Sequence, residues 1–508
     1  MTMTRRTAAE LLRTVLDSGS YRSWDTSPDH RHADPGYRRQ LADAAAASGA
    51  DEAVLTGEGR IAGRDVAVVC SEFGFLAGSI GAATADRIVA AVERATARHL
   101  PLLAATASGG TRMQEGTPAF LRMADITAAI TAHKAVGLPY LVYLRHPTTG
   151  GVLASWGSLG HVTVAEPGAL IGFLGPKVHA ALHDGTPFPP GVQTAEHLHT
   201  HGILDGVLPV EHLAATAARV LALLDPATST APEPPPEPSG PADSAWAHVT
   251  ATRDPDRPGA RELLRATTDA VPLAGTGQGE TGTGVLLALA RFGGAPCVLV
   301  AQDRRRQAHR PLGPGALRVA RRGMRLAAEL GLPLVTVVDT PGAALTPAAE
   351  EGGLAGEIAR CLADLVALPV PTVSVLLGQG TGGAALALLP ADAVLAARHA
   401  WLTPLPPEGA AAILHGSVDR AADVAAAQRI RAADLREIGA VDRIVDERPD
   451  AAAEPSAFTG RVAHAIEAEL HRLAALPAAE RRAARRDRLR GGWRAGARTP
   501  GPGEEETT

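Results

Sequence analysis

Leu100-Pro-Leu-Leu-Ala-Ala-Thr-Ala-Ser-Gly-Gly110 is an apolar run that ends in two adjacent glycines. A similar run, Leu332-Pro-Leu-Val-Thr-Val-Val-Asp-Thr-Pro-Gly342, occurs 232 positions later. Short apolar runs bounded by glycine and proline predict buried strands. The chain therefore contains the same predicted strand and turn twice.

The repeat extends well beyond this one strand. Four pairs of residues share the separation of 232 positions: Pro101 and Pro333, Gly110 and Gly342, Gly151 and Gly383, and Leu170 and Leu402. Further on, Gly202 resembles Gly439, so the separation grows by five and indicates a short insertion in the second copy. A constant separation over several anchors indicates a duplicated domain. Buried strands alternate with alanine-rich helical stretches in each copy, which predicts an α/β fold with parallel strands.

The composition of the chain divides it into five parts. Residues 225–245 are rich in proline and acidic residues and predict an extended linker. The last part, 481–508, is rich in arginine, glycine and glutamate, which predicts disorder. We therefore expect an N-terminal extension at 1–50, a first domain at 51–224, the linker, a second domain at 246–480 and a disordered tail.

Bulk charge and cysteine content exclude several classes of protein. The net charge of -5 gives no support for nucleic-acid binding. The three cysteines form no CxxC pair, which excludes a cysteine-based zinc site and fits a reducing compartment. No apolar run is long enough to predict a membrane span, and no signal peptide is recognised. The sequence predicts a cytoplasmic protein.

Three motifs suggest other chemistries. Gly378-Gln-Gly-Thr-Gly-Gly383 satisfies the dinucleotide pattern GxGxxG, but the next strand ends in Arg398 and His399 instead of an acid for the ribose. Asp339-Thr-Pro-Gly342 imitates a GTPase turn, yet neither lysine of the chain lies in a phosphate-binding loop. His197, His199 and His201 could hold a metal only on a strand, and this stretch is predicted to end a helix. We expect no metal in the chain.

The glycine turns remain as the most informative feature. Turns at strand ends leave backbone N–H groups that can hold a developing anion. No GxSxG elbow and no HExxH motif accompany them. This combination suits a reaction in which backbone N–H groups stabilise an oxyanion and a bound cofactor handles the proton.

Long motifs in both halves resemble one known family. SGGTRMQEG (108–116) and PTTGGVLASWGSLGHVTVAEPGALIGFLGPKV (147–178), with the upstream run Ser71–Gly81, resemble the carboxyltransferase beta subunit of acetyl-CoA carboxylase. Arg253-Asp-Pro-Asp-Arg-Pro258, VVDTPGAALTPAAEEGG (337–353), GQGTGGAALAL (378–388) and PPEGAAAIL (406–414) resemble the alpha subunit. The resemblance covers roughly 50–215 and 250–447 and implies tandem crotonase-like domains.

The resemblance also implies roles for particular residues. Gly109 and Gly110 would hold the thioester oxygen of acyl-CoA, and Gly382, Gly383 and Ala384 would hold the ureido oxygen of carboxybiotin. A further set would contact or shape the acyl-CoA site: Ser108, Arg112, Gly150, Gly151, Gly172, Phe73 and Gly78. In the family the active site usually lies between the beta-type domain of one unit and the alpha-type domain of another.

The implied activity transfers a carboxyl group from carboxybiotin to acetyl-CoA or propionyl-CoA, giving a malonyl-type CoA for fatty acid biosynthesis. Neither Lys134 nor Lys177 lies in a Met-Lys-Met biotinylation site, so biotin would be on a separate carrier protein that is loaded by a biotin carboxylase. A homodimer or higher oligomer is expected. The chain departs from the family in lacking the four-cysteine zinc ribbon and in carrying Ala344 and Gly352 where tyrosine and arginine are usual.

Two alternative functions stay open at this point. A carboxyltransferase of a malonate or acyl-CoA decarboxylase system resembles the same two halves. A non-catalytic assembly subunit would keep the fold but would lose one of the glycine pairs, and both pairs are present.

Overall fold

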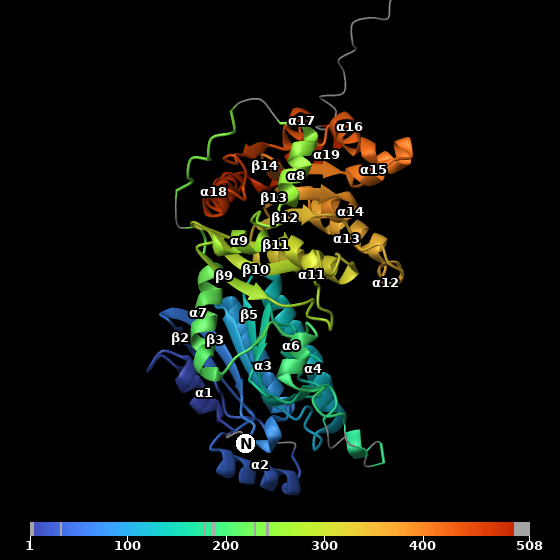
Figure 1. Cartoon of the computed structure of the whole chain (residues 1–508). Helices are drawn as coiled ribbons and strands as arrows, with labels where there is room; N and C mark the ends of the chain where they lie inside the picture. Colours follow the sequence, from blue (N-terminus) through green and yellow to red (C-terminus); the bar gives the residue numbers. More distant parts are fainter. Residues whose placement is uncertain are drawn as a thin grey trace, which may run out of the picture. The chain divides into compact units, whose positions relative to one another are not determined.

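Each half of the chain folds around a sheet with helices packed against it (Figure 1). This computed structural model describes residues 5–30, 33–175, 179–181, 183–184, 186, 188–227, 230–239 and 243–491. The residues fall into two units, one of 1–222 with 273–281 and the other of 223–272 with 282–508. Because 273–281 belong with the first unit, the predicted second domain is interrupted there.

The first unit contains the N-terminal elements and the first sheet. Its strands are β1 (Arg22–Ser23), β2 (Val54–Ile61), β3 (Arg64–Ser71), β4 (Leu102–Ser108), β5 (Tyr140–Thr149), β6 (Val162–Ala165), β7 (Ile171–Gly172) and β8 (Gly206–Val207). Its longer helices are α1 (Ala8–Val15), α2 (Pro35–Ser48), α3 (Ala82–Ala97), α4 (Gly116–Ala135), α6 (Ala195–Thr200) and α7 (Leu213–Leu223), with short 3-10 turns at Leu76–Gly78, Trp156–Ser158 and Val210–His212.

The second unit repeats this arrangement. Its strands are β9 (Asp269–Leu273), β10 (Val285–Phe292), β11 (Ala295–Gln302), β12 (Leu334–Thr340), β13 (Thr372–Thr381), β14 (Ala393–Ala397), β15 (Trp401–Thr403) and β16 (Arg443–Val445). Its helices are α8 (Ala245–Arg253), α9 (Ala260–Arg265), α10 (Arg304–Gln307), α11 (Pro314–Leu330), α12 (Pro347–Glu351), α13 (Leu354–Ala367), α14 (Gly382–Leu386), α15 (Pro407–His415), α16 (Ala421–Ala427), α17 (Ala432–Glu437), α18 (Pro455–Ala474) and α19 (Ala478–Gly491), with a 3-10 turn at Val418–Arg420.

The two sheets have the same topology, which confirms the predicted duplication. The first runs β1-β2-β3-β4-β5-β6-β8 with β7 beside β5, and the second runs β9-β10-β11-β12-β13-β14-β16 with β15 beside β13. Leu102 lies opposite Tyr140 in the first sheet, and Leu334 lies opposite Thr372 in the second, 232 positions later in each strand. Both pairs of strands carry a register shift at the same point, after Thr106 and after Val338.

The register corrects one of the predicted equivalences. Ile171 lies opposite Thr148, and Leu402 lies opposite Gly380. Leu402 is therefore equivalent to Ile171 and not to Leu170, and the separation at this strand is 231. Such a slip of one residue is hard to detect in sequence because both candidates are leucine-like and apolar.

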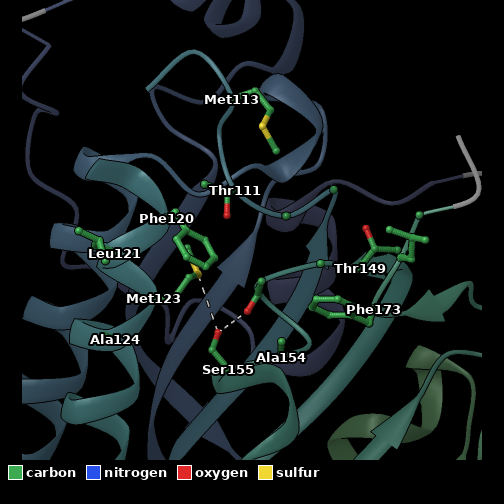
Figure 2. A pocket seen from close by; sticks show the side chains of 16 residues that line it. Thr111, Met113, Phe120, Leu121, Met123, Ala124, Thr149, Ala154, Ser155 and Phe173 are labelled. Carbon is green, nitrogen blue, oxygen red and sulfur yellow. Dashed lines mark hydrogen bonds between the residues drawn. The ribbon is translucent and has the colours of Figure 1, made fainter. Parts of the chain in front are cut away.

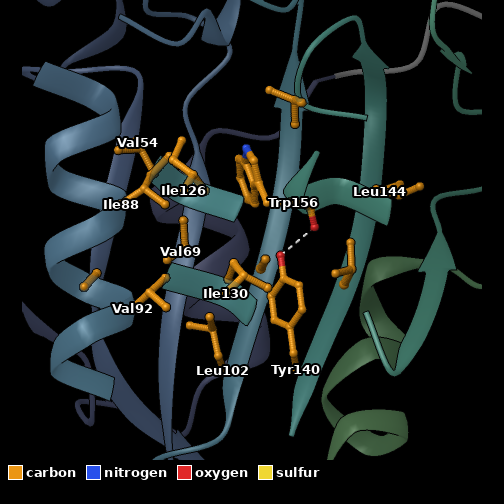
Figure 3. Packing of buried hydrophobic residues seen from close by; sticks show 14 of the residues in the cluster. Val54, Val69, Ile88, Val92, Leu102, Ile126, Ile130, Tyr140, Leu144 and Trp156 are labelled. Carbon is orange, nitrogen blue, oxygen red and sulfur yellow. Dashed lines mark hydrogen bonds between the residues drawn. The ribbon is translucent and has the colours of Figure 1, made fainter. Parts of the chain in front are cut away.

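The core of the first unit lies between β3, β4 and β5 and the helices α3 and α4 (Figure 3). Ile88 and Val92 of α3 and Ile126 and Ile130 of α4 are buried there. Burial of each such side chain contributes about 1.5–3 kcal/mol. All residues of β4 are buried, as expected for a parallel strand that is covered on both faces. The hydroxyl of Tyr140, itself buried, donates a 2.8 Å hydrogen bond to the carbonyl of Trp156.

The prediction of a disordered tail from residue 481 is wrong as far as residue 491. Residues 478–491 form α19, and the buried guanidinium of Arg485 contacts Asp392 at 2.6 Å and the carbonyl of Leu368 at 2.9 Å. Arg481 and Arg485 thus pair with Asp392, and Arg488 pairs with Asp442, carboxylates that lie far away in the chain. Residues 492–508 lie outside the described part of the structure, as does Lys177.

The N-terminal extension and the linker differ in their degree of order. Leu11, Leu12 and Val15 of α1 are buried in the first unit, so residues 5–50 are an integral part of it. Residues 230–239 of the predicted linker form neither helix nor strand.

Candidate active site

Two glycine turns meet at the carboxyl ends of β4 and β5. Gly110 follows β4 with φ +107°, and Gly150 follows β5 with φ +63°. A Cβ atom added to Gly150 would lie 3.2 Å from the Cα atom of Gly110. Both positions require glycine, since positive φ strains other residues and the two backbones approach closely.

The N–H groups of Gly109 and Gly110 are both engaged within the protein. Gly109 donates to the carbonyl of Ala77 at 2.9 Å, and Gly110 donates to Oγ of Ser108 at 3.0 Å. The two donors that the resemblance assigned to the thioester oxygen are therefore not available in this structure. Within the described residues, the backbone N–H groups of Thr111 and Gly151 make no hydrogen bond. The free donors at this turn thus belong to the neighbouring residues.

The second unit has the same pattern. Gly342, equivalent to Gly110, donates to Oγ1 of Thr340 at 3.1 Å, and Pro341 has no N–H at the position of Gly109. The N–H groups of Ala343 and Gly383 are equivalent to those of Thr111 and Gly151. In the described part of the chain neither has a hydrogen-bond partner, and Gly383 is the second residue of α14, where an N–H has no acceptor within the helix. Each unit therefore presents the same two free backbone donors at the carboxyl end of its sheet.

A pocket of about 540 Å³ opens beside the free donors of the first unit (Figure 2). Thr111 and Gly151 both line it. The other lining residues are Gly109, Gly110, Met113, Phe120, Leu121, Met123, Ala124, Thr149, Gly150, Ala154, Ser155, Phe173, Leu174 and Gly175. None of these described residues carries a charged side chain. The site therefore combines backbone donors with an apolar wall, as small-molecule sites commonly do.

The loop that carries Thr111 is held from behind by a buried ion pair. Both guanidinium N–H groups of Arg112 reach Glu52, with Nη1 at 3.1 Å from Oε2. Neither side chain has exposed area. Arg112 also donates to the carbonyl of Ser79 at 2.8 Å. Arg112, predicted to contact substrate, does not line the pocket, and it fixes the loop instead.

A second contact holds the same loop from α2. The hydroxyl of Tyr37 donates to Oε1 of Glu115 at 2.6 Å, and Nε2 of Gln114 donates to Oε1 of Gln40 at 3.0 Å. Oε2 of Glu115 in turn accepts the N–H of Ala82, the first residue of α3, at 2.6 Å. The N-terminal segment therefore contributes to the site, which sequence reasoning missed because nothing local connects residue 37 with residue 115.

Comparison with known proteins identifies the family. The carboxyl transferase domain family matches residues 2–484, nearly the whole chain. The chain belongs to this carboxyltransferase family.

Relatives match this carboxyltransferase over most of its length. The probable biotin-dependent acyl-coenzyme A carboxylase beta3 subunit of Mycobacterium tuberculosis (strain ATCC 25618 / H37Rv) is 60% identical over 96% of this chain and 99% of its own. The acetyl-coenzyme A carboxylase carboxyl transferase subunits beta/alpha of Salinispora arenicola (strain CNS-205) are 37% identical over 97% of this chain and 93% of that protein.

Solved structures share the fold. Transcarboxylase 12S, solved as a hexamer assembly with hydrolysed methylmalonyl-coenzyme A bound, superposes with a TM-score of 0.74 at 21% identity over 93% of this chain and 90% of that one. A single-chain, multi-domain long-chain acyl-CoA carboxylase gives 0.69 at 20% identity over 90% of this chain and 45% of that one. These likenesses agree with the predicted crotonase-like tandem fold.

The remaining residues predicted for the site in the carboxyltransferase's first unit do not line the pocket. Gly78 has φ +61°, and a Cβ atom there would lie 2.1 Å from the carbonyl oxygen of Ala107. The carbonyl of Gly172 accepts the N–H of Gly150 at 3.3 Å. Phe73 lies under the guanidinium of Arg5, 4.1 Å from its ring centroid. None of the three lines the pocket, and Ser108 acts through its bond to Gly110.

In the second unit the predicted residues begin α14. Gly382 has φ +64°, and a Cβ atom added to Gly383 would approach Cδ1 of Ile358 to 3.0 Å. The carbonyl of Ala384 accepts a 2.8 Å hydrogen bond from Nε2 of Gln302 at the end of β11. Oγ1 of Thr381, just before Gly382, is buried without a hydrogen-bond partner in the described residues. This turn therefore combines free backbone donors with an unsatisfied hydroxyl.

The position of the motif at 378–383, which begins inside β13, also argues against dinucleotide binding. Gly378 and Gly380 lie inside β13 and not in the turn that follows it. A Cβ atom at Gly378 would lie 2.6 Å from Oδ1 of Asp339, whose carboxylate accepts the N–H of Gln379 at 3.1 Å. Burial raises the pKa of Asp339. The glycines of this motif make room for a carboxylate and for neighbouring strands instead of cradling a phosphate.

The arginine of the predicted Arg253–Pro258 motif has a structural role. Arg257 contacts Glu447 through both amino groups, at 2.6 and 2.8 Å, and donates to the carbonyl of Leu377 in β13 at 3.0 Å. Nδ1 of His399 lies 2.9 Å from the same carboxylate. Burial alone would raise the pKa of Glu447, but these hydrogen bonds outweigh it and hold the pKa well below its usual range. The buried cluster anchors β13 beneath the second turn.

The histidine segment ends a helix, as predicted. It forms α6, and the rings of His197 and His201 stack with centroids 4.0 Å apart. In the described residues no group of three or more His, Cys, Asp or Glu side chains is placed to hold a metal ion. Over the same residues, no helix combines the length and the hydropathy needed to cross a bilayer.

Proposed function

We propose that the chain is the carboxyltransferase component of a biotin-dependent acyl-CoA carboxylase. It moves a carboxyl group from a carboxylated biotin onto the α-carbon of acyl-CoA, with acetyl-CoA, propionyl-CoA or a longer acyl-CoA as acceptor. The observation that carries this proposal is the pair of equivalent free N–H groups at Gly151 and Gly383, one in each half of a duplicated carboxyltransferase fold. The names of the two relatives agree with this proposal.

The first unit supplies the acceptor site in this proposal. The N–H groups of Thr111 and Gly151 donate to the thioester oxygen, which gains negative charge as the α-proton leaves and an enolate forms. Donors already fixed in place stabilise that charge without reorganisation, and one such donor is worth about 10²–10³ in rate. Gly109 and Gly110 shape the turn, and their engaged N–H groups make it rigid.

The second unit supplies the donor site. Gly382, Gly383 and Ala384, with the N–H of Ala343, would hold the ureido oxygen of biotin. The free N–H groups of Ala343 and Gly383 and the unsatisfied hydroxyl of Thr381 suit a polar group that lies close to the backbone. When bound, carboxylated biotin supplies the carboxyl group and takes up the α-proton. The chain itself then needs only to bind, orient and exclude water.

The proposed partners follow from this division of labour. Biotin would arrive on a separate carrier protein that a biotin carboxylase loads, and the subunit would act as a homodimer or higher oligomer. Malonyl-type CoA would be the product and fatty acid biosynthesis its use. We also place its action in the cytoplasm, since Cys70, Cys297 and Cys361 are all buried free thiols.

The experiment incubates the purified chain with a biotinylated carrier protein, biotin carboxylase, ATP and labelled bicarbonate, and offers a series of acyl-CoAs. Label in a carboxylated acyl-CoA is the expected result. Release of CO₂ from malonyl thioesters, with no carboxylation in the forward direction, would replace the proposal by a decarboxylase function. Inactivity in both directions would leave a non-catalytic assembly subunit.

A further inference from the structure

The pocket of the first unit is lined by exposed apolar side chains that an acetyl group is too small to cover. Met113, Phe120 and Phe173 line it, and their side chains are 82%, 59% and 70% exposed. Phe120 and Phe173 stand on opposite sides of the pocket, and Met123 lies below Phe120 (Figure 2). Exposed aromatic and thioether groups that face one cavity form a surface which gains free energy when an apolar group covers it.

These apolar side chains lie in the same pocket as the free backbone donors, and this position indicates which group covers them. Thr111 and Gly151 line the same pocket, so a thioester oxygen held by their N–H groups would place its acyl chain among these side chains. The acetyl group adds only a methyl beyond the carbonyl and would leave most of the wall in water. No described lining residue is charged, so the described part of the wall favours an uncharged chain over phosphates or an acyl chain with a terminal carboxylate.

We infer that this pocket binds the uncharged aliphatic chain of an acyl-CoA longer than propionyl-CoA, with Phe120 and Phe173 as its walls. The inference rests on the proposed function and narrows its substrate class. Ala124 of α4 also lines the pocket, and its small side chain leaves the space open. Residue 124 is therefore a determinant of chain length.

The test measures binding, which needs neither carrier nor carboxylase. Dissociation constants are determined by calorimetry for CoA and for acetyl-, butyryl-, hexanoyl- and octanoyl-CoA with the full chain. Affinity is expected to rise about fourfold for each added methylene, the factor that corresponds to about 0.8 kcal/mol, until the pocket is filled. Equal affinity along the series would overturn the inference.

Two variants of one helix make the test specific. Ala124→Leu narrows the pocket and is expected to weaken octanoyl-CoA binding by about tenfold or more relative to acetyl-CoA, since the added side chain takes the space of the longer acyl chain. Ala128→Leu is the matched control, because Ala128 is exposed on the same helix and does not line this pocket. Leucine is nearly as good a helix former as alanine, so both variants should fold. Phe120→Ala should flatten the dependence on chain length.

The outcomes separate this inference from the proposed function. If the chain carboxylates acyl-CoAs but Ala124→Leu changes no chain-length preference, the inference fails and the function stands. If Ala124→Leu alters the oligomeric state in light scattering but not the binding series, the wall is covered by a second copy of the chain and the inference also fails. If no acyl-CoA binds more tightly than free CoA and none is carboxylated, both fail.

Discussion

Arg112 and Glu52 form an ion pair that excludes solvent completely, with no exposed area on either side chain. Arg112 lies in the loop after β4, directly beside the free N–H of Thr111, and Glu52 precedes β2. A buried charge that loses its partner costs far more than the intact pair contributes. This ion pair therefore fixes the proposed oxyanion loop, and replacing only one of its two residues should lower the free energy of unfolding strongly.

Single replacement of this pair is expected to destabilise the protein strongly. Arg112→Met or Glu52→Leu should lower the free energy of unfolding by about 3–5 kcal/mol, because each takes away the bidentate partner of a fully buried charge. The double variant should recover part of that loss. Urea titration measures all three, and Arg420→Ala, which breaks an exposed pair with Asp423, should cost less than about 1 kcal/mol. A double variant as unstable as the sum of the single ones would contradict this account.

Tyr37 is expected to act on the reaction from outside the pocket. Tyr37→Phe removes the hydrogen bond to Glu115 and should lower kcat/KM for acyl-CoA by up to about tenfold, since a hydrogen bond to a charged group contributes about 1.5 kcal/mol or more. Steady-state kinetics checks this, with the loss in KM and kcat reported separately.

Tyr21→Phe provides the matched control for that variant. Its hydroxyl donates a 3.0 Å hydrogen bond to the carbonyl of Thr56 in the same unit, away from the loop. Both variants should lower the melting temperature by a similar small amount, and only Tyr37→Phe should lower kcat/KM. Equal kinetic effects would show that Tyr37 stabilises the fold without positioning the loop.

His248 should make the second unit sensitive to acid. Burial, with the nearby His399, lowers the pKa of His248 from 6.5 to about 4. Neither ring nitrogen has a hydrogen-bond partner in the described residues. Because the folded pKa lies below the unfolded one, stability is present above pH 6.5 and is lost as the pH falls towards 4. Between pH 7 and pH 5 the loss is about 2 kcal/mol.

Replacement of His248 by leucine isolates this contribution. Urea titration at pH 7 and pH 5 should show about 2 kcal/mol less pH dependence for His248→Leu than for the natural chain. His415→Leu, at an exposed position in α15, should leave the pH dependence as it is. The assignment is rejected if His248→Leu retains the full dependence.

The sequence predicted the duplicated fold well because a constant spacing survives in strands. Gly110 and Gly342 have φ of +107° and +131°, which few other residues adopt, so they mark the register through both copies. The end of each strand was thus predictable, and with it the place of the site. The slip between Leu170 and Ile171 was not, since either residue suits a buried strand.

The roles of individual donors could not be predicted. Whether the N–H of Gly109 is free depends on the carbonyl of Ala77, and that of Gly110 depends on the side chain of Ser108. The partners of Arg112 and Arg485 lie 60 and 93 residues away, so both arginines looked available for substrate or solvent. Such contacts follow from the assembled fold and leave no local signal in the sequence.

The most direct test of the central claim removes one backbone donor in each unit. Gly151→Pro and Gly383→Pro delete the free N–H groups, and Gly151→Ala and Gly383→Ala keep them while adding only a Cβ atom. Transfer of labelled carboxyl from a carboxylated biotin carrier to acyl-CoA is measured for all four. The account predicts that each proline variant loses about 10²–10³ in rate relative to its alanine control. Proline variants as active as their alanine controls would contradict it.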